Sequence, residues 1–86
     1  MKIRVVAKRE SYWRYTIVEW IKEVKDILEQ EYGVKIEVVE EDCEDELPEV
    51  WVDDVFSFKG VPREEGYLIE LLKISIEEKL RRIEGK

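Results

Sequence analysis

The sequence predicts an α/β domain with the element order β-α-β-β-β-α, in which two long helices accompany a mixed sheet. Apolar residues recur at spacings of three and four over residues 13–28 and over 68–83, which is the period of amphipathic helices. Residues 34–39 alternate β-branched with charged side chains, as a strand does. Two short apolar runs, 50–52 and 55–58, are separated by two aspartates, which favours a hairpin.

The N-terminal part of the chain predicts a strand at residues 2–7 followed by the first helix. Ser11 is expected to cap the N-terminus of this helix, and Gly33 is expected to end it in a left-handed conformation. The apolar stripe of the helix, assigned to the core, consists of Trp13, Ile17, Trp20, Ile21, Val24, Ile27 and Leu28.

The central segment is expected to connect two strands. Residues 40–46 predict a charged connection that is too short for a stable helix. Asp53 and Asp54 predict a tight turn, because Asp tolerates a left-handed backbone better than most residues do.

The last helix is expected to begin after Gly66 and to end at Gly85, with Arg81 and Arg82 complementing its dipole. Its apolar stripe consists of Leu68, Leu71, Leu72, Ile76, Leu80 and Ile83. Ile69 and Ile74 widen this stripe, so the helix is either buried between sheet and neighbouring helix or used in a dimer contact.

The order of the elements restricts the topology of residues 1–86, which are expected to form a single domain. A right-handed crossover through the first helix makes the first two strands parallel. The hairpin then adds two antiparallel strands, and both helices cover the sheet.

Composition excludes several classes of site. The 86 residues contain one cysteine and no histidine, which rules out an internal disulfide and a zinc site of Cys and His ligands. Charged residues make up 43%, with no Asn, which is typical of hyperthermophile proteins. No apolar run approaches a membrane span, and Met1 leads directly into a strand, so we expect a soluble cytoplasmic protein. No cofactor is assigned.

The net charge of −7 is concentrated in one segment, because residues 37–54 hold ten acids and no base. A nucleic-acid partner is therefore not expected. The favoured interpretation of the segment is a solvated loop; a cationic partner or a hard cation is the alternative. The segment lacks the spacing and the turn glycine of an EF-hand loop, so no metal ligands are assigned.

Residues 47–72 carry a resemblance to a known fold. Leu47-Pro48 precedes the hairpin of residues 50–58, and Gly60 and a helix from Leu68 follow it. This order resembles the small form of the thioredoxin-like superfamily, in particular the minimal archaeal thioredoxin-like and selenoprotein W-like proteins. The resemblance raises the expectation of a cis peptide bond before Pro48.

The same resemblance places the redox motif of the family, two cysteines separated by two residues, at Lys8-Arg9-Glu10-Ser11. Lys8 and Ser11 stand at the cysteine positions, so the dithiol chemistry of the family is not expected here. No catalytic residue is assigned, since Ser11 also lacks a histidine base and fits an N-cap instead.

The sequence therefore favours an interaction module over an enzyme. A candidate groove formed by Lys8, Ser11, Tyr12, Leu47 and Pro48 would accept an extended peptide from a protein partner through backbone hydrogen bonds. One alternative is a one-cysteine redox protein using Cys43, although its acidic neighbours disfavour the thiolate. Another is a structural homodimer through the C-terminal helix.

Overall fold

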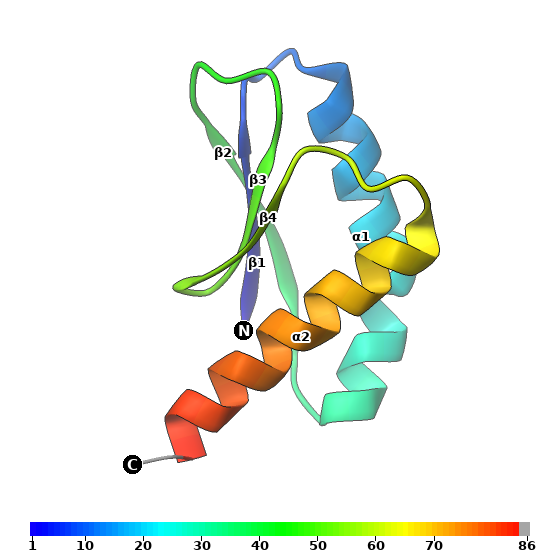
Figure 1. Cartoon of the computed structure of the whole chain (residues 1–86), viewed down its shortest axis with the longest axis vertical. Coiled ribbons are helices and arrows are strands. Elements are labelled where there is room, and N and C mark those ends of the chain that lie inside the picture. The colour runs from blue at the N-terminus through cyan, green and yellow to red at the C-terminus, as the bar shows by residue number, and fades with distance from the viewer. Residues whose placement is uncertain (85–86) are drawn as a thin grey trace.

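The computed structural model describes residues 1–84 and shows a small α/β arrangement of a four-stranded mixed sheet and two helices (Figure 1). The elements follow the predicted order. They are β1 (Lys2–Ala7), α1 (Tyr12–Tyr32), β2 (Glu37–Asp42), β3 (Glu49–Val52), β4 (Val55–Lys59) and α2 (Glu65–Glu84).

The sheet has the strand order β2-β1-β3-β4. β1 lies parallel to β2, with Lys2 opposite Glu37 and Ala7 opposite Asp42. β1 is antiparallel to β3, and β3 is antiparallel to β4, with an irregularity between Val50 and Trp51. The parallel pair and the antiparallel hairpin are both confirmed.

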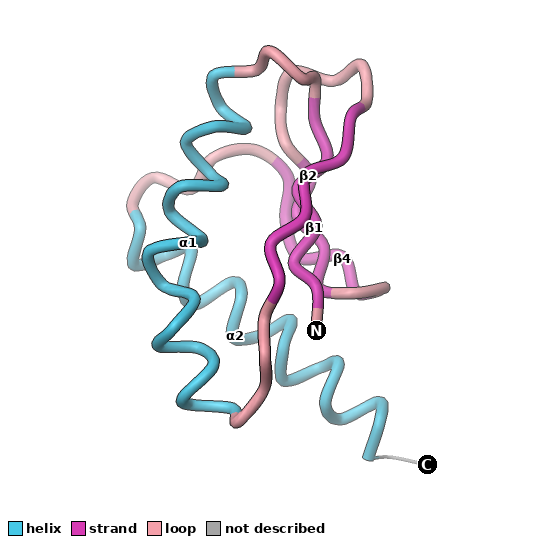
Figure 2. Tube along the Cα trace, turned by 180° about the vertical axis from the view of Figure 1, so that it is seen from behind, coloured by secondary structure: helices cyan, strands magenta, loops and turns pink. Residues whose placement is uncertain are grey.

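Both helices lie on the same side of the sheet, which gives the molecule two layers (Figure 2). Alternate residues of β1 and β3 point toward the helices and are fully buried, whereas their neighbours point the other way. On that other face Arg4 lies over the ring of Trp51, which meets Phe56 edge to face.

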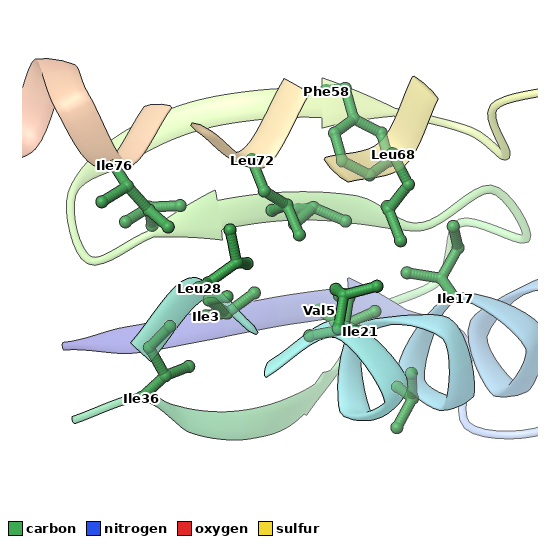
Figure 3. Packing of buried hydrophobic residues seen from close by; sticks show 14 residues of the cluster. Ile3, Val5, Ile17, Ile21, Leu28, Ile36, Phe58, Leu68, Leu72 and Ile76 are labelled. Atoms are coloured by element: carbon green, nitrogen blue, oxygen red, sulfur yellow. The ribbon is translucent and has the colours of Figure 1, made fainter. Parts of the chain in front are cut away.

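The core fills the space between the two layers (Figure 3). Its largest fully buried side chains come from β1, α1 and α2: Ile3, Ile17, Ile21, Leu28, Leu68, Leu72 and Ile76. Burying each such aliphatic side chain contributes about 1.5–3 kcal/mol. The core therefore holds both helices against the centre of the sheet.

The ends of α1 are confirmed as predicted. Ser11 Oγ accepts a 3.2 Å hydrogen bond from the Arg14 N–H, which caps the N-terminus. Gly33 has a φ of 65°, and its N–H donates to Glu29 O at 2.9 Å.

The turn between β3 and β4 also matches its prediction, with Asp53 at a φ of 53°. Asp53 Oδ1 accepts a 2.8 Å hydrogen bond from the Lys2 N–H of β1. Asp54 accepts a 2.8 Å hydrogen bond from Lys79 Nζ, which ties the turn to α2.

The predicted bounds of the second strand were wrong, because β2 spans Glu37–Asp42 rather than residues 34–39. Parallel pairing with β1 starts at Glu37, whose N–H donates to Met1 O at 2.9 Å. Before it, the Ile36 N–H donates instead to Glu29 Oε2 at 2.7 Å. The acids at 40–42 therefore belong to a strand and not to a connection.

Two members of the predicted stripe of α1 lie outside the core. Trp13 is 44% exposed and Ile27 is 56% exposed, so their assignment to the core was wrong. Because Arg14 and Val18 are buried as well, the buried face of α1 is rotated relative to the predicted stripe, and Trp13 and Ile27 fall at or beyond its edge.

In α2, helical structure begins at Glu65, one residue before Gly66. Leu68, Leu72 and Ile76 form its buried face, whereas Ile74 and Ile83 are more than half exposed. The predicted helix end at Gly85 lies outside the described residues. Over residues 1–84, neither helix has the length and apolar composition that crossing a membrane would require.

Candidate binding groove

A groove of about 500 Å³ opens where the start of α1 meets the loops on either side of the hairpin. These three segments lie in the upper half of the view in Figure 1. The lining side chains are mostly apolar and aromatic: Tyr12, Trp13, Thr16, Trp20, Leu47, Val61, Pro62 and Arg63.

The first wall of the groove is one face of α1. Trp13, Thr16 and Trp20 are three, four and seven residues apart, so they lie above one another on the helix. Tyr12 meets Trp13 edge to face, with 5.5 Å between ring centroids and 72° between ring planes. Such a pair is a favoured aromatic geometry and fixes both rings at the rim.

The second wall is the loop before β3, which the N-cap of α1 holds in place. Ser11 Oγ donates a 2.6 Å hydrogen bond to Glu46 O while it accepts from the Arg14 N–H. Leu47 follows at once and contributes its side chain to the groove. One buried hydroxyl therefore joins the start of the helix to the opposite wall.

The third wall is residues 61–63, between β4 and α2. The Gly60 N–H donates to Pro48 O at 2.8 Å, so this loop is tied to the loop before β3. Gly60 has a φ of 96°, which other residues rarely adopt. After the turn at Gly60, the chain continues through Val61, Pro62 and Arg63, which line the groove.

Large apolar side chains are unusually exposed around this groove. Tyr12 is 69% exposed, Trp13 is 44% exposed and Leu47 is 45% exposed. Contiguous exposed apolar surface of this kind marks interaction sites on small proteins. Tyr and Trp are also the side chains that most often dominate the binding energy of interfaces.

The five residues predicted for the groove have three different positions. Tyr12 and Leu47 line it. Ser11 is 4% exposed and Pro48 is fully buried, so both support the walls from behind. Lys8 is exposed and lies 3.8 Å from the Glu46 carboxylate.

The remaining lining residues were missed from the sequence. Trp13 and Trp20 were assigned to the core because they continue the apolar stripe of α1. Val61, Pro62 and Arg63 precede the predicted last helix, and the sequence assigns them no role. Their proximity to Leu47 depends on the hairpin folding back, which local patterns do not encode.

The backbone around Pro48 is largely engaged within the domain. The Leu47 N–H donates to Asp45 Oδ1 at 3.0 Å, while Glu46 O and Pro48 O accept from Ser11 and Gly60. The peptide bond before Pro48 is trans, because the described residues contain no cis peptide bond. A ligand in the groove would therefore contact mainly side chains.

The acidic segment is not a free solvated loop, contrary to the favoured interpretation of the sequence. Six of its carboxylates lie within 4 Å of a basic side chain from elsewhere in the chain: Glu40, Glu41, Asp42, Asp45, Glu46 and Asp54. Ion pairs with Arg4, Arg14 and Lys59 hold the pKa values of Glu41, Asp42 and Asp45 below their usual range.

Cys43 lies in the loop after β2 and is exposed. Its N–H donates to Ala7 O at 3.0 Å, and its Sγ accepts a 3.4 Å hydrogen bond from the Asp45 N–H. Cys43 does not line the groove. The thiol is therefore fixed beside the β1–α1 connection, on a different part of the surface.

Within the part of the chain that the structure describes, no three Cys, Asp or Glu side chains are arranged to hold a metal ion. No protein-family model matches this chain, and no curated protein or solved structure matches it significantly.

Proposed function

We propose that this chain is a non-catalytic, thioredoxin-like binding domain that holds an extended segment of a partner protein in its aromatic groove. The observation that carries the proposal is the exposure of Tyr12, Trp13 and Leu47 around a groove of about 500 Å³. Burying these side chains against a partner would remove apolar surface from water, which is the main driving force of association.

The arrangement of the sheet supports the thioredoxin-like part of the proposal. The strand order β2-β1-β3-β4, with β1 parallel to β2 and antiparallel to β3, agrees with the small form of that fold. The groove begins at Tyr12, the residue after the N-cap Ser11 of α1. Neither Lys8 nor Ser11 carries a thiol, which favours a binding role over dithiol chemistry for this end of the domain.

Selection from a displayed library of random peptides tests the proposal, with a matched pair of variants. Trp13→Ala removes a ring from the groove. Tyr15→Ala removes a ring from the same helix that is 64% exposed but does not line the groove. We expect the same peptides to be enriched on the wild type and on Tyr15→Ala, and to be lost on Trp13→Ala.

Two results would contradict the proposal. One is the absence of any enriched peptide on the wild type. The other is equal enrichment on the wild type and on Trp13→Ala, which would place the binding surface elsewhere.

A homodimer through α2 is the second candidate, because Tyr67 and Ile74 are both more than half exposed. They are seven residues apart and so lie on one side of the helix, whereas Ile83 lies nine residues after Ile74, about half a turn away. Light scattering at high protein concentration distinguishes the candidates. A mass near 10.4 kDa rules out the dimer, and a doubled mass that Ile74→Glu halves supports it.

A further inference from the structure

Among the described residues 1–84, Arg63 is the only charged side chain that lines the groove. Within residues 1–84 it makes no ion pair, whereas Arg4, Arg9 and Arg14 each pair with carboxylates of the acidic segment. In a chain with 22 acids and 15 bases, an arginine left without a carboxylate among aromatic side chains is available to a ligand.

The apolar surface continues on the far side of Arg63. Next to the groove is a second hollow of about 340 Å³, to which Phe58, Tyr67 and Leu71 contribute apolar and aromatic surface. Lys59 also lines this hollow, but its ammonium is paired with Asp45 at 2.6 Å. The two hollows share residues 61–63. A segment that crosses from one to the other would therefore pass the Arg63 guanidinium with apolar contacts on both sides.

The surroundings also restrict the conformation of such a segment. Addition of a strand would need backbone donors and acceptors, but Glu46 O, the Leu47 N–H and Pro48 O are already engaged. A polyproline II segment makes no such demand, since its backbone is solvated and its rings dock into grooves lined by aromatic side chains. Tyr12, Trp13 and Trp20 supply such a lining.

We propose that the occupant is a proline-containing segment of a partner protein that carries an Asp or Glu side chain, and that this carboxylate pairs with Arg63. The inference rests on the proposed function and adds the chemistry of the ligand. Arg is suited to this role because its guanidinium is weakly hydrated and binds carboxylates through two parallel hydrogen bonds.

The charge of the rest of the domain makes this pairing selective. The net charge of −7 repels an acidic segment at long range, so a carboxylate is favourable only where it meets Arg63 directly. A segment with one well-placed acid and several prolines fits the groove, whereas a highly acidic segment does not.

Three synthetic peptides test the inference: Pro-Leu-Pro-Glu-Pro-Leu-Pro with its single Glu, the same peptide with Gln for Glu, and the same peptide with Ala for Pro. Dissociation constants are measured by fluorescence anisotropy on the wild type, Arg63→Gln, Arg63→Lys and Arg81→Gln. Arg81 is a matched control, since it is exposed in the last turn of α2 and does not line the groove.

The Glu peptide is expected to bind Arg63→Gln about fivefold more weakly than the wild type, a typical effect of one partly exposed ion pair. The Gln peptide is expected to bind both proteins equally. Arg63→Lys should bind the Glu peptide more tightly than Arg63→Gln does, but less tightly than the wild type. Arg81→Gln should leave the dissociation constants of the Glu and Gln peptides unchanged. The Ala peptide binds more weakly than the Glu peptide to every protein.

The inference is overturned if Arg63→Gln changes the binding of the Glu and Gln peptides equally, or if the Ala peptide binds as tightly as the Glu peptide. It is also overturned if none of the three peptides binds.

The proposed function is tested separately by the random peptide library. Enriched peptides that lack Pro and acidic residues would support binding in the groove but refute the proposed chemistry of the ligand. A groove occupied by a second copy would appear as a dimer that Trp13→Ala dissociates.

Discussion

Arg14 Nη1 lies 2.8 Å from Asp42 Oδ1 and joins α1 to the last residue of the edge strand β2. The same nitrogen donates to Ala7 O at 3.0 Å, and Arg14 Nε donates to Glu40 Oε1 at 3.1 Å. The guanidinium is therefore surrounded by acceptors from β1 and β2. Parallel edge strands pair less stably per residue than antiparallel ones, so this contact helps to hold β2 in place.

Replacing Arg14 is expected to destabilise the domain strongly. Arg14→Ala leaves Ala7 O without this donor and removes both ion pairs, so the free energy of unfolding should fall by about 2–4 kcal/mol. Urea unfolding followed by circular dichroism measures the change. Arg9→Ala is the control, because Arg9 also binds Asp42 but is 79% exposed. Its loss should stay within about 0.5 kcal/mol, and equal losses for the two variants would refute the structural role of Arg14.

The stability of the domain is expected to fall in acid. Ion pairs lower the folded-state pKa values of Glu41, Asp42, Asp45 and Asp54, so the folded state binds fewer protons than the unfolded state. The contribution is complete above about pH 5 and is lost as the pH falls through about 4 and below.

Thermal unfolding between pH 7 and pH 2.5 measures this dependence. Asp42→Asn cannot be protonated, so its melting temperature should be lower than that of the wild type at pH 7 and should fall less steeply in acid. If the melting temperatures of the two proteins fall equally steeply with pH, Asp42 does not contribute to the loss of stability in acid.

Much of the fold could be predicted because the signals are local. The N-cap at Ser11, the left-handed Gly33 and the turn at Asp53 each follow from the conformational preference of one residue type. The order and type of the elements follow from hydrophobic periodicity. These signals do not depend on which segments meet in space.

The groove could not be predicted in the same way, because its walls come from three separate segments. A Trp at the edge of a helical stripe looks the same in sequence whether it is buried or, like Trp13, exposed at a rim. The acidic segment was misjudged for a related reason. Arg4 is 37 residues from Glu41, and Arg14 is 26 residues from Glu40. Lys59 of β4 pairs with Asp45, which lies before β3. Long-range ion pairs leave no periodic signal.

Glu65 is expected to limit stability at neutral pH. Contact with the Glu23 carboxyl of α1 and burial raise the pKa of Glu65, and its Oε2 atom is buried without a hydrogen-bond partner within residues 1–84. Because the folded state holds this proton more tightly, stability falls as the pH rises from about 4.5 through the raised folded-state pKa.

Glu65→Gln should therefore raise the melting temperature at pH 7 and have little effect at pH 4. Glu64→Gln is the control, since it removes the same charge from the adjacent position near the N-terminus of α2. If both variants change the melting temperature equally at pH 7, the effect belongs to the helix N-terminus and not to the contact with Glu23.

Asp53 is expected to combine a conformational role with a hydrogen bond. Asp53→Ala keeps the left-handed backbone but loses the acceptor for the Lys2 N–H, so the free energy of unfolding should fall by about 1–2 kcal/mol. Asp53→Asn retains the oxygen and tolerates the backbone, so it should lie within about 0.5 kcal/mol of the wild type. Urea unfolding of the two variants checks this. If Asp53→Asn lowers the free energy of unfolding as much as Asp53→Ala does, neither the backbone conformation nor the hydrogen bond to Lys2 explains the role of Asp53.

Ser11 is expected to affect both the stability of α1 and the binding of ligands in the groove. Ser11→Ala removes the N-cap and the hydrogen bond to Glu46 O, so the free energy of unfolding should fall by about 1–2 kcal/mol. Leu47 should then be less firmly placed, and peptides selected on the wild type should bind more weakly.

Ser11→Asp separates the two roles, because a carboxylate caps the helix but cannot donate to Glu46 O. We expect it to retain more of the helix-capping contribution than Ser11→Ala does, while binding of the selected peptides remains weakened. Urea unfolding and fluorescence anisotropy measure the two effects independently. Wild-type affinity in Ser11→Asp would show that the hydrogen bond to Glu46 does not position the wall of the groove.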